Sequence, residues 1–258
     1  MGEDGLMEPS EPPSYTDIAG RVLAMIDHTS LGDNETEADI ARLCAEAVTP
    51  HGGVASICTW PRLIAIAHEL LGGGEVGIAS VSNFPAGTGD IDAVVEEALG
   101  AVAAGATEID VVVPWEAHRD GDPEAVARLV GAVRDALEDH TVLKAILETG
   151  ELADDDLIRS CATAAAGAGA DFLKTSSGKT PRSATHEAAE ILLEVAHEFR
   201  EKGHTVGVKI SGGVRDLAAA SAYLEIADRV MGPTWATPFT FRFGASSLLP
   251  DVLLRLDG

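Results

Sequence analysis

The segments EIDVVV (108–113), PEAVARLVGAVRDALE (123–138) and VLKAIL (142–147) follow one another, separated by short polar stretches. The first and third are short apolar runs, which favour strands that are buried on both faces. The middle segment begins with a proline, which suits a helix start, and its apolar residues recur at helical spacing. A strand, a helix and a second strand in this order predict two parallel strands joined by a helical crossover.

The same alternation continues along most of the chain and predicts eight strands, at 25–28, 54–58, 76–81, 108–113, 142–147, 171–174, 206–210 and 241–244. Helices are expected at 35–47, 61–71, 91–104, 123–138, 154–166, 186–201, 216–224 and 247–256. Eight such units in about 250 residues fit a closed (β/α)8 TIM barrel, a single α/β domain with parallel strands, better than an open doubly wound sheet. The open sheet remains the alternative, although no GxGxxG motif follows the first strands. We expect the barrel over 15–258, after a loose acidic tail at 1–14.

Composition narrows the function classes. The 258 residues carry a net charge of −24, which should repel nucleic acid and anionic membranes. An anionic substrate would therefore need its own local basic site. No apolar run approaches the roughly 18 residues of a membrane span, and the N-terminal residues lack a leader pattern. The three cysteines are far apart and form no CxxC pair, which favours a reducing compartment, so we expect a cytoplasmic protein.

Four charged residues interrupt segments that should be buried: Asp110, Lys144, Lys174 and Lys209. Each fits one consistent face of its strand. A single such lysine could belong to an ion pair that only fixes strand register. Three lysines and one aspartate on separate strands, in a chain with only five lysines, favour a catalytic group instead. The carboxyl ends of the strands are also where barrel enzymes keep their chemistry.

A buried lysine beside a second cation gives up its proton more easily, so its pKa can fall from about 10.4 toward about 7. The neutral amine can attack a carbonyl carbon, and the resulting iminium permits carbon–carbon cleavage or formation without a metal or other cofactor. We interpret Lys174 as this amine, Lys209 as the neighbouring charge and Asp110 as a group that moves protons through a water molecule. The eight histidines show neither HxH nor HExxH spacing, which disfavours a metal-dependent aldolase.

Glycine and serine residues follow the last three predicted strands, in TSSGK (175–179), SGGVR (211–215) and GASS (244–247). Glycines let backbone N–H groups approach an anion, and the start of a helix adds a favourable dipole. Lys179 and Arg215 supply nearby positive charge. Because a phosphate site between the seventh and eighth strands recurs in such barrels, these segments predict a phosphate site.

Three segments, FLKTSSGK (172–179), GVKISGGVR (207–215) and RFGASSL (242–248), resemble deoxyribose-phosphate aldolases, and the likeness spans nearly the whole barrel. The resemblance implies reversible cleavage of 2-deoxyribose 5-phosphate into glyceraldehyde 3-phosphate and acetaldehyde. It implies the same roles for Lys174, Lys209 and Asp110. It further implies that the phosphate is held by Gly212, Gly213, Ser246 and Ser247, with help from Gly178 and Lys179.

Two other functions stay open at this point. Another phosphosugar barrel, either a transaldolase-like aldolase or an epimerase, would share the phosphate loops and differ in its products. A non-catalytic phosphate-binding barrel would keep the glycines without needing the lysines. We expect the partners to be small phosphosugar and aldehyde substrates, and neither nucleic acid nor membrane. The oligomeric state considered for the protein is a homodimer.

Overall fold

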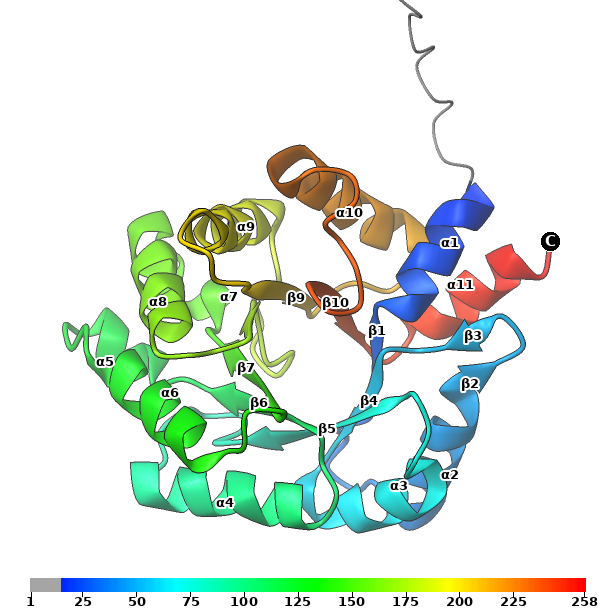
Figure 1. The fold of residues 1–258 in the computed structure, drawn as a ribbon, viewed down its shortest axis with the longest axis horizontal. Helices are drawn as coiled ribbons and strands as arrows, with labels where there is room; N and C mark the ends of the chain where they lie inside the picture. Colours follow the sequence, from blue (N-terminus) through cyan, green and yellow to red (C-terminus); the bar gives the residue numbers. More distant parts are fainter. Residues whose placement is uncertain (1–14) are drawn as a thin grey trace, which may run out of the picture.

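The computed structural model describes residues 15–258. Eight parallel strands close into a barrel in which each strand lies beside its sequence neighbours and the last strand pairs with the first (Figure 1). They are β1 (Ile26–Thr29), β4 (Ser56–Thr59), β5 (Gly77–Ser82), β6 (Glu108–Val112), β7 (Val142–Ile146), β8 (Phe172–Lys174), β9 (Gly207–Ser211) and β10 (Phe241–Ala245). The predicted single-domain (β/α)8 barrel is confirmed, and the open-sheet alternative is wrong. The tail expected at 1–14 lies outside the described residues.

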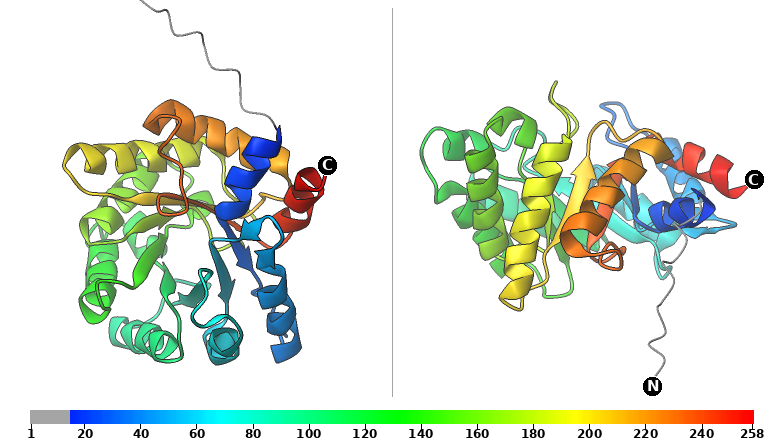
Figure 2. Two further views of the ribbon diagram at one scale, coloured as in Figure 1. Left: turned by 45° about the vertical axis from the view of Figure 1, so that its right-hand side comes forward. Right: turned by 90° about the horizontal axis from the view of Figure 1, so that it is seen from above.

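Helices surround the barrel, as the two further views in Figure 2 show. The main ones are α1 (Tyr15–Ala24), α2 (Glu37–Glu46), α3 (Ile64–Leu71), α4 (Ile91–Ala103), α6 (Ala125–Ala136), α8 (Asp155–Gly167), α9 (His186–Glu201), α10 (Leu217–Met231) and α11 (Leu248–Leu256). Shorter elements that the sequence pattern did not predict are the hairpin of β2 (Val48–Thr49) and β3 (Gly52–Gly53), and the helices α5 (Trp115–Arg119) and α7 (Thr149–Leu152). A 3-10 turn, η1 (Pro61–Leu63), precedes α3. No helix in the described part is long and apolar enough to cross a membrane.

The expected end of the seventh helix at residue 224 is wrong, because α10 continues to Met231. Ala227 and Met231 extend its buried face beyond that point. The helix ends at Gly232, whose φ of 96° is accessible mainly to glycine.

Several helices begin with a side-chain cap just after a strand. Thr36 and Asp39 form a reciprocal capping box at the start of α2, and the Thr185 hydroxyl accepts from the backbone N–H of Ala188 at the start of α9. Such caps satisfy backbone N–H groups that have no partner within the helix. They therefore fix the helix starts at the end of the barrel where the strand-to-helix loops lie.

The aliphatic core lies mainly outside the barrel, between the outer strand faces and the helices. Ile26, Ile109 and Val208 belong to this layer and are fully buried. Inside the barrel, a small apolar cluster of Leu31, Cys58, Ala79 and Val81 occupies the side formed by β4 and β5. Buried charged side chains occupy much of the remaining interior, and they form the candidate site.

Candidate active site

Seven charged side chains meet inside the barrel, and none of these residues is more than 5% exposed. We call them the ion network: Asp27, Glu108, Asp110, Lys144, Lys174, Lys209 and Arg242. Asp110 on β6 contacts Lys209 on β9, although these two strands are not neighbours. Side chains from non-adjacent strands can touch only across the interior, so the network fills the space that aliphatic side chains occupy in many barrels.

Asp110 lies at the centre of the three predicted catalytic residues. Its Oδ2 atom is 2.7 Å from the Nζ atoms of both Lys174 and Lys209, and its Oδ1 atom is 2.7 Å from Lys144 Nζ. Burial would raise the pKa of this carboxyl group, but the three ammonium groups hold the pKa well below its usual value. Asp110 is therefore a carboxylate shared by three amines, and the structure brings it together with Lys174 and Lys209 as expected.

The two lysines that share Asp110 Oδ2 differ in proton affinity. Burial lowers the pKa of Lys174, Asp110 opposes this effect, and the charge of Lys209 lowers the pKa further, so the net pKa shift is downward. Lys209 is also desolvated, but it faces both Asp110 and Asp27, and its pKa is raised. Lys174 is thus the amine that loses its proton first, while Lys209 keeps its charge.

Charge balance leads to the same assignment. In their charged forms the network groups comprise four cations and three carboxylates, which leaves one excess positive charge. A buried cluster with excess charge is costly, and loss of one proton makes this cluster neutral. The pKa of Lys144 is raised, since the attraction of Asp110, Glu108 and Asp27 outweighs its burial. The proton therefore leaves from Lys174, which lies at the edge of the network beside a cavity.

The other network residues hold the charged groups in place. Asp27 Oδ2 lies 2.5 Å from Lys209 Nζ, and Asp27 Oδ1 lies 2.6 Å from an Arg242 nitrogen. Arg242 also reaches Glu108 at 3.2 Å, and Glu108 lies 2.5 Å from Lys144 Nζ. Both carboxylate oxygens of Asp27 are therefore engaged in ion pairs. The sequence pattern did not predict that Arg242 and Glu108 belong to the ion network.

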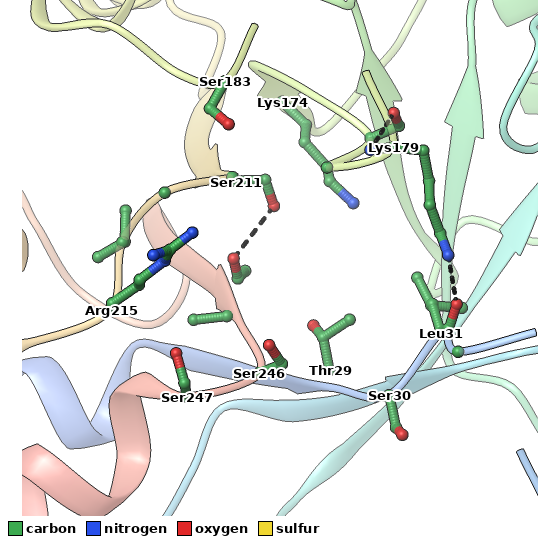
Figure 3. A pocket seen from close by; sticks show the side chains of 18 of the residues that line it. Thr29, Ser30, Leu31, Lys174, Lys179, Ser183, Ser211, Arg215, Ser246 and Ser247 are labelled. Atoms are coloured by element: carbon green, nitrogen blue, oxygen red, sulfur yellow. Dashed lines mark hydrogen bonds between the residues drawn. The ribbon is translucent and has the colours of Figure 1, made fainter. Parts of the chain in front are cut away.

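A cavity of about 500 Å³ opens beside Lys174 at the carboxyl ends of the strands (Figure 3). All six residues of the predicted phosphate site line this cavity, namely Gly178, Lys179, Gly212, Gly213, Ser246 and Ser247. Arg215 lines it as well. The structure therefore places Lys174, the candidate for Schiff-base formation, and the candidate phosphate-binding residues around the same cavity.

Gly212 and Gly213 shape one wall of the cavity. Their φ angles of 86° and 89° lie in the left-handed region, which favours glycine. A Cβ atom at Gly212 would also come within 3.2 Å of Ser183. After the neighbouring strand β10, Ser246 and Ser247 lead directly into α11, and Ser247 makes no side-chain capping bond to that helix. Backbone N–H groups and hydroxyls at these places can hold an anion.

The amine of Lys179 bonds to the loop after β1. Its Nζ atom donates to the carbonyl oxygen of Leu31 at 2.7 Å and lies 3.6 Å from a carboxylate oxygen of Asp33. In Figure 3, Lys179 and Ser246 lie on opposite sides of Lys174. In this arrangement the Lys179 amine connects the loop after β8 to the loop after β1.

Glu148 organises the loop that carries Gly178 and Lys179. It is fully buried at the end of β7, and its carboxylate accepts hydrogen bonds from the backbone N–H of Ser177 and the hydroxyl of Thr180. Its position beside the loop after β8 depends on how the two strand ends meet in space.

The cavity lining does not include Asn83, His28 or Cys58, which lie near the strand ends. The side chain of Asn83 donates to Val112 O and accepts from Gly89 N, both at 2.8 Å. His28 Nε2 is 3.0 Å from a Glu46 oxygen. Cys58 is fully buried, and burial raises the pKa of its thiol. Within residues 15–258, no group of three or more His, Cys, Asp or Glu side chains is arranged to hold a metal ion.

Comparisons with known proteins agree with this geometry. A family model described as "DeoC/LacD family aldolase" matches residues 21–248. A structure from Toxoplasma gondii ME49, provisionally named a deoxyribose-phosphate aldolase, is 26% identical, with a TM-score of 0.87 over 94% of this chain and 95% of that one. One from Coccidioides immitis, with the same provisional name, is 30% identical over 92% and 86% of the two chains, with a TM-score of 0.81. The deoxyribose phosphate aldolase of Aeropyrum pernix, described as a unique tetramer, is 30% identical over 95% and 93%, with a TM-score of 0.73.

Proposed function

The chain belongs to the DeoC/LacD family of aldolases, and on this premise we propose that it reversibly cleaves 2-deoxyribose 5-phosphate into glyceraldehyde 3-phosphate and acetaldehyde. The observation that carries the proposal is the position of Lys174. Its pKa is lowered, it shares a carboxylate oxygen with Lys209, and it faces a cavity lined by glycines, serines and Arg215. The site thus pairs a nucleophilic amine with groups suited to a phosphate.

In the proposed reaction, the neutral amine of Lys174 adds to the C1 carbonyl of the open-chain sugar, and loss of water gives an iminium. The C3 hydroxyl then loses its proton, and the electrons of the C2–C3 bond move into the iminium. Glyceraldehyde 3-phosphate leaves, and an enamine remains on Lys174. The enamine takes up a proton at C2, and water hydrolyses the new iminium to release acetaldehyde and the free amine.

The neighbouring groups have defined tasks in this scheme. Lys209 retains its charge and favours the neutral form of Lys174, as the opposite directions of the pKa shifts of the two lysines support. Asp110 Oδ2 contacts both amines, so it can accept the proton that leaves Lys174 and, through a water molecule, serve the later proton transfers. We also place the enzyme in the cytoplasm, since its three cysteines are buried free thiols.

Borohydride reduction in the presence of deoxyribose 5-phosphate or acetaldehyde should attach a two-carbon or five-carbon adduct to Lys174. Peptide mapping by mass spectrometry identifies the modified lysine. Lys144, which is also buried in the network, serves as the internal control and should remain unmodified. An adduct on Lys144 or Lys179, or the absence of any adduct, would contradict the assignment. Detection of acetaldehyde as a product separates this reaction from an epimerase or a transaldolase-like activity.

Replacing Ser246 by aspartate should raise the KM for deoxyribose 5-phosphate by roughly tenfold or more, because a carboxylate in the anion site repels phosphate. The reaction of unphosphorylated deoxyribose should change far less. Ser246→Asn is the matched control, because it adds similar bulk without the charge. If both substrates lose activity equally in the aspartate variant, Ser246 does not face the phosphate.

A further inference from the structure

A hydroxyl group lies between the reactive amine and the phosphate candidates. Ser211 ends β9, two residues after Lys209 and immediately before Gly212. It is 5% exposed and lines the cavity. Figure 3 shows Ser211 between Lys174 on one side and Arg215 on the other. Ser211 therefore lies in the part of the cavity between Lys174 and the loop that carries Gly212 and Gly213.

The backbone of Ser211 is held by the residue that follows Lys174. The Ser211 N–H donates to Thr175 Oγ1 at 3.0 Å, and the Thr175 hydroxyl donates to the Ser211 carbonyl at 3.2 Å. Thr175 is itself fully buried. These two bonds fix Ser211 relative to the reactive lysine, so the position of its hydroxyl does not depend on a mobile loop.

The hydroxyl of Ser211 has little to bond to within the protein. Among residues 15–258, its one hydrogen-bond acceptor is the carbonyl oxygen of Gly244 at 3.5 Å, well beyond the usual 2.7–2.8 Å of a hydroxyl–oxygen bond. The absence of a side chain at Gly244 makes room for it, because a Cβ atom there would lie 2.0 Å from Ser211 Oγ. A nearly buried hydroxyl with a long bond retains both its donor and its acceptor capacity for a ligand.

We propose that Ser211 determines acceptor specificity by hydrogen bonding the hydroxyl on the carbon next to the phosphate-bearing carbon. This inference rests on the proposed function. In the open-chain substrate, C1 is attached to Lys174 and C5 carries the phosphate, so C3 and C4 span the intervening space. C3 lies at the bond that breaks, near Lys209 and Asp110. Ser211 directly precedes Gly212 and Gly213, which are candidates for holding the phosphate on C5. Its hydroxyl therefore lies beside C4, the carbon that becomes C2 of glyceraldehyde 3-phosphate.

The test compares two acceptors in the synthetic direction, with acetaldehyde as the donor. Glyceraldehyde 3-phosphate carries the hydroxyl in question, and 3-phosphooxypropanal lacks it but keeps the aldehyde and the phosphate. Ser211→Ala should lower kcat/KM for glyceraldehyde 3-phosphate by about fivefold to tenfold, the value of one hydrogen bond. The value for 3-phosphooxypropanal should fall by less than about twofold, because that acceptor never makes the bond.

Ser176→Ala is the matched control. Ser176 is fully buried near the same strand ends, its hydroxyl has no hydrogen-bond partner among the described residues, and it does not line the cavity. This variant should leave the ratio of kcat/KM for the two acceptors unchanged. Borohydride trapping and thermal unfolding establish that both variants are folded and retain a reactive Lys174.

Equal losses on the two acceptors in Ser211→Ala, or no loss on either, would overturn the assignment of Ser211. The first result would mean that the hydroxyl acts on the phosphate or on the fold. A wild-type protein that joins acetaldehyde to neither acceptor would instead refute the proposed function, and this inference with it. The wild-type reactions therefore separate the two failures.

Discussion

Replacing Lys209 by methionine should lower turnover at neutral pH by about 100-fold, which corresponds to a rise of roughly two units in the pKa of Lys174. In the wild-type protein, burial and the charge of Lys209 together keep that pKa below its usual value. The variant retains the burial and removes the charge. It also leaves the ion network with three cations and three carboxylates, so a protonated Lys174 now balances the cluster.

The sign of the effect follows from which form of Lys174 reacts. Only the neutral amine attacks a carbonyl, so activity falls as the pH drops below the pKa of Lys174. A nearby ammonium group disfavours a second ammonium group, so removing it raises this pKa. The acid limb of the pH–rate profile must therefore move to higher pH, and activity should partly recover in alkali.

The rate of borohydride trapping as a function of pH measures this shift directly. Lys179→Met is the control, because it removes another lysine from the same cavity that does not contribute to the pKa shift of Lys174. Its acid limb should stay in place. If the acid limb of the pH–rate profile of Lys209→Met does not move either, while its rate falls at every pH, Lys209 acts by contacting the substrate. A limb that moves to lower pH would contradict the electrostatic argument.

Replacing Lys144 by methionine should destabilise the fold by about 3–5 kcal/mol, because the change removes one partner from buried ion pairs. Lys144 Nζ lies 2.5 Å from Glu108, 2.7 Å from Asp110 and 3.6 Å from Asp27. Methionine fills a similar volume but leaves these carboxylates with fewer cations in a site that water does not reach. The loss is large relative to the roughly 5–15 kcal/mol of a typical domain.

Urea unfolding of the two proteins measures this difference, provided that the dependence of the unfolding free energy on urea is unchanged. Lys202→Met is the surface control, since Lys202 is exposed at the end of α9 and only approaches the ring of Phe199. Its effect should stay below about 1 kcal/mol. A Lys144 variant no less stable than this control would mean that Lys174 or the carboxylates compensate for the loss by binding a proton.

The strands and the inward face of each catalytic candidate were predictable because their signals are local. A parallel strand covered on both sides is an apolar run, so β6 was expected at 108–113 and runs from Glu108 to Val112. Within such a run the alternation of side chains places Asp110 on one face. The same reasoning placed Lys144, Lys174 and Lys209 on one face of their strands. Side chains on four separate strands of a closed barrel can meet only if that face points into the barrel.

What was missed depends on partners that are distant in the sequence. Helix α1 was not predicted, and it packs against α11 at the other end of the chain, a partner that the local sequence does not reveal. Helices α5 and α7 have five and four residues, too few to show a period. The bond between Arg242 and Glu108 requires the closed barrel, because the two residues are 134 positions apart and lie on strands that are not neighbours.

The register of the barrel also limits how this site can change over generations. Lys174 lies level with Lys209, Lys209 with Arg242, and Asp110 with Lys144, on adjacent strands. Side chains alternate between the two faces, so inserting or deleting one residue within β8 would turn Lys174 toward the helices and separate it from the carboxylate that it shares. Evolution of a new substrate specificity on this site can therefore proceed by point substitutions and by changes in the loops. Insertions or deletions within the strands would disrupt the ion network.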